Sequence, residues 1–493
     1  MKHSVNTLVA VAILVLLTVS FAPVHPAKAA LTGLRVDPEA LGILSNQDST
    51  ASTVAVSGNV QISVQHFPGK TISHTEPSAA VSISNKQNVL VGYHDRFPVF
   101  SSFVCAISIS NDGGASYTFT GATPLSQSTD FCSDAAVAAH PDGSFYYAYL
   151  SVRNAGDTTD LRVAKVNSDG SVAFSTLAVK GDPAVNFPDK EYIAVDGNAN
   201  SPFKGTIYVT WTEFLLPNDP NALDNGQIRI VKSTDGGVTW SSPLALSPDA
   251  LFPRAISGSD PVVAPDGTLY VFYADFTSGT GPTSIRFVKS TDGGNTFSAP
   301  SNVARNVPSP GRFRLQNADP NFGITPGRGF RSNSFPSAAV SPDGSLSVVW
   351  TDFSSGSCTP DGTGRPPCSG SDIRYASSLD GGSTWTHSVT VVDDGNGDKF
   401  FPWISAQPSG RVNIVWGDKR LDSQNINYDV FYTSTTDHGK SFTVNHRIST
   451  ATSIIGTATF IGDYFNLADS ATTLQAVWDD RRTGINEIEG ATI

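Results

Sequence analysis

The sequence is poor in charged side chains and in signs of helix. Asp, Glu, Lys and Arg make up 15% of the 493 residues, below the roughly 25% of an average soluble domain. No long stretch has apolar residues at the spacing of an amphipathic helix. Gly 43 and Pro 31 indicate many turns instead. These features favour an all-β fold.

Several site signatures are also missing. The chain has no histidine cluster with zinc spacing, no Gly-x-Ser-x-Gly turn and no glycine-rich phosphate loop. A net charge of −12 argues against nucleic acid and anionic membrane surfaces as partners. An anionic substrate would therefore require a local basic cluster.

The most apolar run lies at the N-terminus. Val9–Val19 follows the basic Lys2 and His3, and the small residues up to Ala30 offer a cleavage site after Ala29. This is typical of a secretory signal peptide, and the run is short for a membrane span. The alternative is a retained N-terminal anchor. No later segment suggests a transmembrane helix, so we expect a secreted, extracellular and monomeric protein.

The four cysteines fit an oxidising compartment. Cys358 and Cys368 enclose a short loop and predict one disulfide bond. Cys105 and Cys132 lie in neighbouring repeats and are candidates for a second. Four free thiols are the alternative, which an even count in an exported chain disfavours.

One eight-residue pattern returns along the chain. It combines a hydroxyl residue, Asp, Gly, a second hydroxyl residue and an aromatic. The copies are Ser110–Tyr117, Ser233–Trp240, Ser290–Phe297, Ser378–Trp385 and Thr435–Phe442, with a degenerate copy at Asn167–Phe174. The Asp carboxylate can accept backbone N–H groups of a tight turn, and Gly tolerates a positive φ. We call these segments the repeat turns.

The repeat turns resemble the Asp-box, or BNR repeat, of the sialidase-like β-propellers. The resemblance implies a β-propeller of four-stranded antiparallel blades. It is specific for architecture, because Asp-boxes also occur in propellers that are not sialidases. Fold alone does not establish activity.

The number of repeats predicts seven blades. Their first strands begin near Glu76, Cys132, Phe187, Ser257, Ser334, Phe400 and Thr459. Classical sialidases have six blades, and six blades with the last unit as an appendage is the alternative. The last unit ends after its third strand, so the spare β stretch within Thr53–Val64 should supply its fourth strand and close the ring. This divides the chain into a signal peptide (1–29), an N-terminal extension (30–52) and the propeller (53–493).

Connectivity indicates which end of the ring carries a site. Strands alternate in direction, so the repeat turns and the turns between first and second strands share one end. The longer loops share the other, near the starts of the first strands, and long loops on a rigid scaffold often carry function. We therefore expect the site opposite the repeat turns, near the axis.

Acidic and basic residues recur at that end. We predict a catalytic group of Glu213, Asp418, Asp463 and Tyr464, and a substrate-binding group of Lys190, Asp275, Arg331, Asp352, Arg420 and Arg481. Paired carboxyls serve glycoside cleavage, one as acid and one as base or nucleophile. The alternative for the acids that end second strands is a structural one, in which each caps its loop or pairs with a nearby Arg. A buried tyrosine that closes the core is likewise the alternative for Tyr464.

The sialidase motifs themselves do not transfer. That family holds the substrate carboxylate with three arginines, the first in an Arg-Ile-Pro context, and uses a Tyr–Glu nucleophile pair with an Asp acid/base. This chain lacks Arg-Ile-Pro, and Arg331, Arg420 and Arg481 match the triad by type only.

One segment suggests a metal. Asp394, Asn396 and Asp398 place oxygen ligands at alternate positions, as a calcium loop does. The twelve-residue EF-hand frame is absent, and an acidic glycine-rich turn is the alternative. A structural calcium ion is the one cofactor that the sequence suggests.

Together these features predict an exported, sialidase-like glycoside hydrolase acting on an extracellular glycan or glycoprotein. Whether the chain is an enzyme is left open, because a non-catalytic propeller that binds a glycan or protein is the competing hypothesis.

Overall fold

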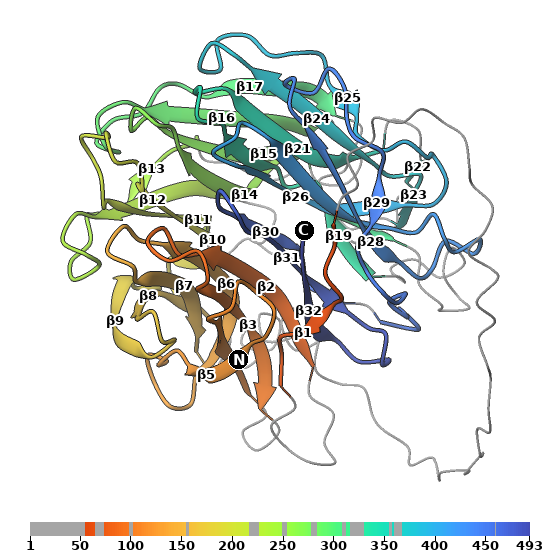
Figure 1. The fold of residues 1–493 in the computed structure, drawn as a ribbon. Helices are drawn as coiled ribbons and strands as arrows, with labels where there is room; N and C mark the ends of the chain where they lie inside the picture. Colours follow the sequence, from red (N-terminus) through yellow and green to blue (C-terminus); the bar gives the residue numbers. More distant parts are fainter. Residues whose placement is uncertain are drawn as a thin grey trace, which may run out of the picture. The chain divides into compact units, whose positions relative to one another are not determined.

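Seven four-stranded antiparallel blades form a ring (Figure 1). The structure is a computed structural model that describes residues 55–64, 73–97, 102–153, 157–215, 226–248, 254–277, 283–307, 312–315, 330–353, 357–358, 367–458 and 460–493. The predicted signal peptide and extension lie outside these residues. All regular elements among them are strands, and they include no helix of the length and hydropathy that crossing a membrane requires.

Blades 1 to 4 each use four consecutive strands. They are β2 (His74–Val81), β3 (Val89–Phe97), β4 (Ser102–Ser110) and β5 (Thr118–Ala122); β6 (Phe131–Ala139), β7 (Phe145–Val152), β8 (Thr159–Val166) and β9 (Val172–Val179); β10 (Asn186–Val195), β11 (Ile207–Leu215), β12 (Gln227–Ser233) and β13 (Leu244–Ala245); and β14 (Arg254–Val263), β15 (Leu269–Thr277), β16 (Thr283–Ser290) and β17 (Ser301–Val307).

Blades 5 to 7 complete the ring. They are β20 (Ser337–Val340), β21 (Leu346–Asp352), β24 (Asp372–Ser378) and β25 (Val389–Thr390); β26 (Lys399–Ala406), β27 (Val412–Asp418), β28 (Asp429–Thr435) and β29 (His446–Arg447); and β30 (Asn466–Asp469), β31 (Leu474–Asp480), β32 (Glu487–Thr492) and β1 (Val60–Gln61). The first strand of each blade contacts the first strand of the next, and β30 contacts β2.

The second strand of each blade forms the centre of the core. Every residue of β7, β21, β27 and β31 is buried, because each blade has a neighbour on both faces. Aromatic and β-branched residues suit such two-sided burial. Phe272 of blade 4, for example, shares one apolar cluster with Trp350 of blade 5.

The first and last described strands meet in blade 7, which confirms the predicted closure. Val60 of β1 pairs with Gly490 of β32, and Ile62 N donates to the Ile488 carbonyl at 2.8 Å. The red β1 lies beside the dark blue β32 in Figure 1. Seven blades are therefore present, and the six-blade alternative is wrong.

The repeat turns share one hydrogen-bond pattern. Ser233 Oγ donates to Asp235 Oδ1 at 2.7 Å and accepts from Gly237 N at 2.8 Å, and Thr239 Oγ1 donates to Asp235 Oδ2 at 2.6 Å. Four other copies repeat these bonds. Gly237 has φ of 82°, where a Cβ is strained. The pattern holds each turn between a third and a fourth strand.

A small additional sheet is inserted around blade 5. It consists of β18 (Arg312–Leu315), β19 (Phe330–Asn333), β22 (Ser357–Cys358) and β23 (Pro367–Ser369). Strand pairing places Cys358 opposite Cys368, but these two side chains, and hence the predicted bridge, lie outside the described ones. The chain does form the Cys105–Cys132 disulfide.

Candidate active site at the propeller axis

Five first strands carry a β-bulge near their start. The register shifts in β2, β6, β10, β14 and β26. The bulged residues all have positive φ: Glu76 57°, Asp134 50°, Lys190 54°, Gly258 71° and Phe401 50°. A non-glycine residue in this region is strained by about 1 kcal/mol or more. Bulges re-aim side chains and are frequent beside active sites, so this end of the ring is the candidate site.

The bulges lie opposite the repeat turns. First and second strands are antiparallel, so the start of a first strand pairs with the end of the second, as Pro188 does with Glu213 and Ile256 with Asp275. The repeat turns occupy the other end. The bulges therefore lie on the side that the connectivity indicates.

An ion pair links blade 7 to the inserted sheet. Arg331 of β19 binds both carboxylate oxygens of Asp463, with Nε at 2.7 Å from Oδ1 and Nη2 against Oδ2. Asn333 Nδ2 donates to the Asp463 carbonyl at 2.7 Å. The side chain of Asp463 is 13% exposed. A bidentate Arg–carboxylate pair of this kind fixes the carboxylate geometrically.

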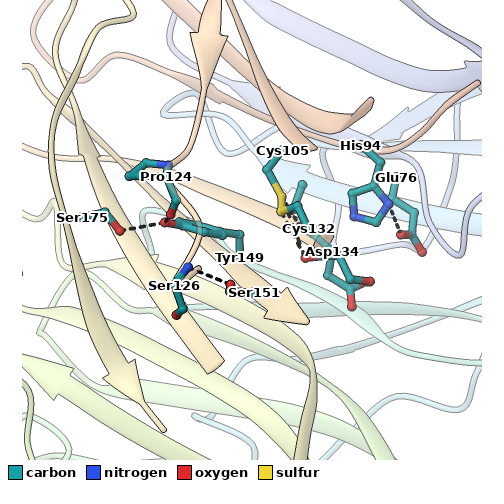
Figure 2. The surroundings of a disulfide bond; sticks show 12 residues. Glu76, His94, Cys105, Pro124, Ser126, Cys132, Asp134, Tyr149, Ser151 and Ser175 are labelled. Carbon is teal, nitrogen blue, oxygen red and sulfur yellow. Dashed lines mark hydrogen bonds and ion pairs between the residues drawn. A yellow bond between two sulfur atoms is a disulfide. The ribbon is translucent and has the colours of Figure 1, made fainter. Parts of the chain in front are cut away.

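Acidic groups from blades 1, 2 and 7 gather beside this pair. The Glu76 carboxylate lies 3.1 Å from His94 Nδ1 (Figure 2). Burial, followed by repulsion from Asp134 and Asp463, raises the pKa of Glu76 well above its usual value. Burial and then Glu76 do the same to the pKa of Asp479, while burial lowers the pKa of His94. We call Glu76, His94, Asp134, Asp463 and Asp479 the axial acid cluster.

Lys190 supplies a second cation. It is 6% exposed, and its Nζ lies 3.6 Å from the centroid of the Tyr464 ring. This Nζ has no hydrogen-bond acceptor. The charge of Lys190 acts to lower the pKa values of Glu76 and Glu191, which burial raises. A buried amino group without an acceptor is costly, and an oxygen atom of an incoming ligand could accept its hydrogen bond.

A pocket, which we call the axial pocket, is lined by residues of blades 3, 4, 6 and 7 and of the segment ahead of blade 5. Its lining residues are Lys190, Tyr192, Gly258, Ser259, Asp260, Asn333, Phe335, Pro336, Phe401, Pro402, Trp403, Asp463 and Tyr464. Its volume of 20 Å³ holds about one water molecule. Phe335, Trp403 and Asp463 are partly exposed, so a larger molecule would meet the pocket at these three residues.

Asp260 brings a second carboxyl to this pocket. It is 6% exposed, and its Oδ2 accepts a hydrogen bond from Ala338 N at 2.7 Å. Burial raises the pKa of Asp260 to about 7. The pocket thus holds one carboxyl that carries a proton near neutrality and one, Asp463, whose charge Arg331 compensates.

Aromatic rings form one wall. Tyr192 and Trp403 are stacked with centroids 5.1 Å apart, and Tyr464 packs edge-on against Tyr192 at 5.8 Å. The Tyr464 hydroxyl contacts both the N and the O of Ala135 at 3.1 Å, and burial raises its pKa well above the usual range. Tyr464 therefore lines the site with its ring, while its hydroxyl is held by the backbone, as in the core-closing alternative.

The acids that end second strands are held in repeated structural contacts. Glu213 Oε2 and Asp418 Oδ2 accept from the indole Nε1 of Trp211 at 2.7 Å and Trp416 at 2.8 Å. Each acid also faces an Arg; the pairs are Glu213–Arg229, Asp275–Arg286, Asp352–Arg374 and Asp418–Arg420, with N–O distances of 3.9, 2.9, 3.0 and 2.8 Å. None of these acids lines the axial pocket. Their geometry follows the structural alternative.

The predicted arginines do not meet. Arg420 binds Asp418 and Asp393, and Arg481 donates to the Ile454 and Gly484 carbonyls and to Asn486. Arg331 is the one of the three with an ion pair to a member of the axial acid cluster. Of the predicted site residues, the structure brings together Lys190, Arg331, Asp463 and Tyr464.

The predicted calcium segment is organised around protein groups. Asp394 Oδ1 accepts from Asn396 N at 2.8 Å, as in an Asx-turn. Asp398 accepts from Gly370 N at 2.6 Å, and Lys399 Nζ binds the Asn396 and Gly397 carbonyls. The described residues contain no group of three acidic, His or Cys side chains placed to hold a metal.

Sequence reasoning missed Glu76, His94, Asp134 and Trp403 as site residues. Glu76 and Asp134 stand two positions before the runs Ser78–Val81 and Ala136–Ala139, just as Lys190 stands two positions before Tyr192–Val195. An alignment of the strand starts would have revealed two of these positions. His94 lies near the end of β3, and its partner Glu76 is 18 positions earlier in the chain. No local sequence pattern signals such a pair.

Comparisons with known proteins return structural likeness only. No family model and no curated sequence matches. Solved structures with similarity include a Fusarium graminearum α-L-arabinofuranosidase (12% identity, TM-score 0.45, 89% of this chain and 98% of that chain) and a Penicillium chrysogenum α-L-arabinanase (13%, 0.44, 89% and 98%). A leech intramolecular trans-sialidase is a third (14%, 0.41, 85% and 68%). At these values the likeness does not decide the activity.

Proposed function

We propose that the protein is an exported, monomeric glycoside hydrolase whose active site is the axial pocket. The observation that carries the proposal is the pair of carboxyls that line this pocket, Asp260 and Asp463. Their surroundings favour opposite protonation states, which is how acid and base roles are divided between two carboxyls. Both line the space beside an aromatic wall.

The two carboxyls have complementary roles in this proposal. Protonated Asp260 donates its proton to the glycosidic oxygen as that oxygen leaves. Ionised Asp463, held by Arg331, either removes a proton from the attacking water or attacks the anomeric carbon itself. In both routes the bond from the anomeric carbon to the leaving oxygen breaks. In the first route water forms the new bond to that carbon and gives its proton to Asp463; in the second, Asp463 forms the bond, and water then displaces Asp463 while the deprotonated Asp260 takes the water proton.

Neighbouring side chains position the sugar. The partly exposed Trp403, stacked on Tyr192, offers an apolar face on which a sugar ring can lie. Lys190 Nζ, which has no acceptor in the protein, donates to a sugar oxygen. The 20 Å³ interior accommodates the attacking water, while the sugar occupies the mouth.

The charges in the site favour an uncharged sugar over a sialoside. A carboxylate on the substrate would need an uncompensated arginine cluster. Arg331 is already paired with Asp463, and Arg420 and Arg481 bind elsewhere. The sialidase-like specificity that the repeat turns suggest is therefore the less favoured outcome of a substrate screen.

The alternative function is a non-catalytic propeller that binds a glycan or protein on the same end of the ring. The small interior volume favours it, because ligand pockets usually measure about 300 Å³ or more. A binding surface would not need two carboxyls in opposite protonation states, and this supports the hydrolase proposal.

A panel of fluorogenic glycosides separates the two functions. We expect cleavage of an uncharged glycoside, with a rate that declines above about pH 7 as Asp260 loses its proton. Uronides and sialosides in the same panel test the charge argument. Binding on a glycan array without cleavage of any glycoside would instead establish the binding propeller.

Asp260 also predicts a pH dependence of stability. Its folded pKa of about 7 exceeds the ~3.9 of an unfolded Asp. Between these values the folded chain keeps a proton that the unfolded chain has released, so the free energy of unfolding falls as pH rises, by about 1.4 kcal/mol per unit for this group. Urea denaturation across this range should give a shallower fall for Asp260→Asn. Equal slopes for the variant and the parent protein would contradict the assignment.

A further inference from the structure

The Cys105–Cys132 disulfide lies beside three members of the axial acid cluster, Glu76, His94 and Asp134 (Figure 2). It joins β4, the third strand of blade 1, to β6, the first strand of blade 2. Both cysteines are at most 1% exposed. The bond therefore crosses between two blades inside the core rather than stapling a surface loop.

Each cysteine is adjacent to a member of the cluster. Cys132 lies two residues before the bulged Asp134, and Cys105 Sγ lies 3.4 Å from the Asp134 carbonyl oxygen. Cys105 is also the cross-strand partner of His94, whose Nδ1 is 3.1 Å from Glu76. One end of the disulfide thus fixes the strand that carries Asp134, and the other fixes the strand paired with His94.

The Asp134 bulge needs such support. Asp134 has φ of 50°, a conformation that persists only where the surroundings hold it. The ionised forms of Asp134 and Glu76 disfavour each other, so wherever both are charged they tend to separate. The disulfide opposes this separation, because it restricts how far β6 can move from β4.

We propose that the Cys105–Cys132 disulfide is a positioning element, which holds the Asp134 bulge against His94 and Glu76 and thereby sets the protonation behaviour of the axial acid cluster. The proposal concerns the cluster itself and does not depend on the hydrolase activity. It assigns this bond a role at the site in addition to stabilisation of the fold.

His94 is the reporter for this arrangement. The groups that face it are Glu76 from β2, Asp134 from β6, Lys190 from β10 and Asp463 ahead of β30, with the Phe103 ring of β4 at 6.2 Å. Burial is the largest cause of its lowered pKa. Loosening of the bulge would admit water, which raises the His94 pKa, and would weaken the contacts with Asp134, which lowers it. Because burial is the largest of these effects, we expect a net rise toward the ordinary value.

The test is an NMR titration of the His94 imidazole in protein labelled at histidine, assigned with a His94→Gln variant. In Cys105→Ala/Cys132→Ala we expect the His94 midpoint to rise by about half a pH unit or more, with an unchanged far-UV circular dichroism spectrum. If that pair does not fold, Cys105→Val/Cys132→Ala fills more of the vacated space and takes its place.

Ile109→Ala is the matched control. Ile109 is a 2% exposed residue of β4 in the same apolar cluster as both cysteines, so the change lowers stability without removing the disulfide. It should leave the His94 midpoint where it is in the parent protein. Superimposable His94 titrations in the disulfide-free variant and the parent would overturn the proposal, as would an equal shift in Ile109→Ala.

Discussion

Removal of residues 55–64 is expected to destabilise all seven blades, not only the last. These residues contain β1, which supplies the outer strand of blade 7. Ser57 and Ile62 donate to the Thr492 and Ile488 carbonyls, and Ile62 is 1% exposed in a cluster with Val477 and Ile488. Loss of a buried Ile removes about 2–5 kcal/mol, and each lost hydrogen bond adds about 1 kcal/mol.

Thermal unfolding of two truncated proteins measures this effect. A protein that begins at Ala55 retains β1 and serves as the control. One that begins at Gln65 should unfold at a clearly lower temperature and in a broader transition, because blade 7 is left with an unpaired edge. If the two melt together, the ring does not depend on this closure.

Asp463→Asn is expected to lower kcat/KM for the best glycoside by about 10²–10⁴, the usual worth of an acid–base group. The amide preserves the size of the side chain but removes the charge that faces Arg331. It also leaves Arg331 without its partner, which should reduce stability by about 3 kcal/mol. Both effects come from one residue, so the activity loss must be separated from the stability loss.

Asp429→Asn separates them. Asp429 of β28 is 1% exposed and accepts from Arg447 Nε at 2.9 Å and Nη2 at 2.6 Å, so it is also a buried Asp in an Arg pair. It lies outside the axial pocket. Asp429→Asn should lose stability and keep kcat/KM. An equal loss of kcat/KM in the two variants would remove Asp463 from the mechanism.

The architecture could be predicted because most blades contain a local sequence pattern, the repeat turn. The bonds among Ser233, Asp235, Gly237 and Thr239 that shape a repeat turn lie within eight residues, so this chemistry is visible in the sequence. The closure by residues 53–64 could be inferred as well, since the last unit ends one strand short. Local turns and a count of strands are sufficient for a fold made of repeats.

The site could be predicted only in part, because its contacts are not local. Arg331 and Asp463 are 132 residues apart, and the Asp134 bulge is a backbone feature that no residue pattern shows. Asp418 was predicted as a site residue on a different basis, its recurring position. Its place at the end of a second strand recurs from blade to blade, and that recurrence reflects the contacts with Trp416 and Arg420.

The most direct test of the central claim is a crystal structure of the Asp260→Asn protein soaked with the uncharged glycoside that the parent cleaves best. Loss of the general acid should slow turnover enough for the intact ligand to be seen. The account predicts a sugar ring against Trp403, with its glycosidic oxygen beside residue 260 and Lys190 Nζ donating to a sugar oxygen. A ligand bound at any other part of the ring, with the axial pocket unchanged, would contradict it.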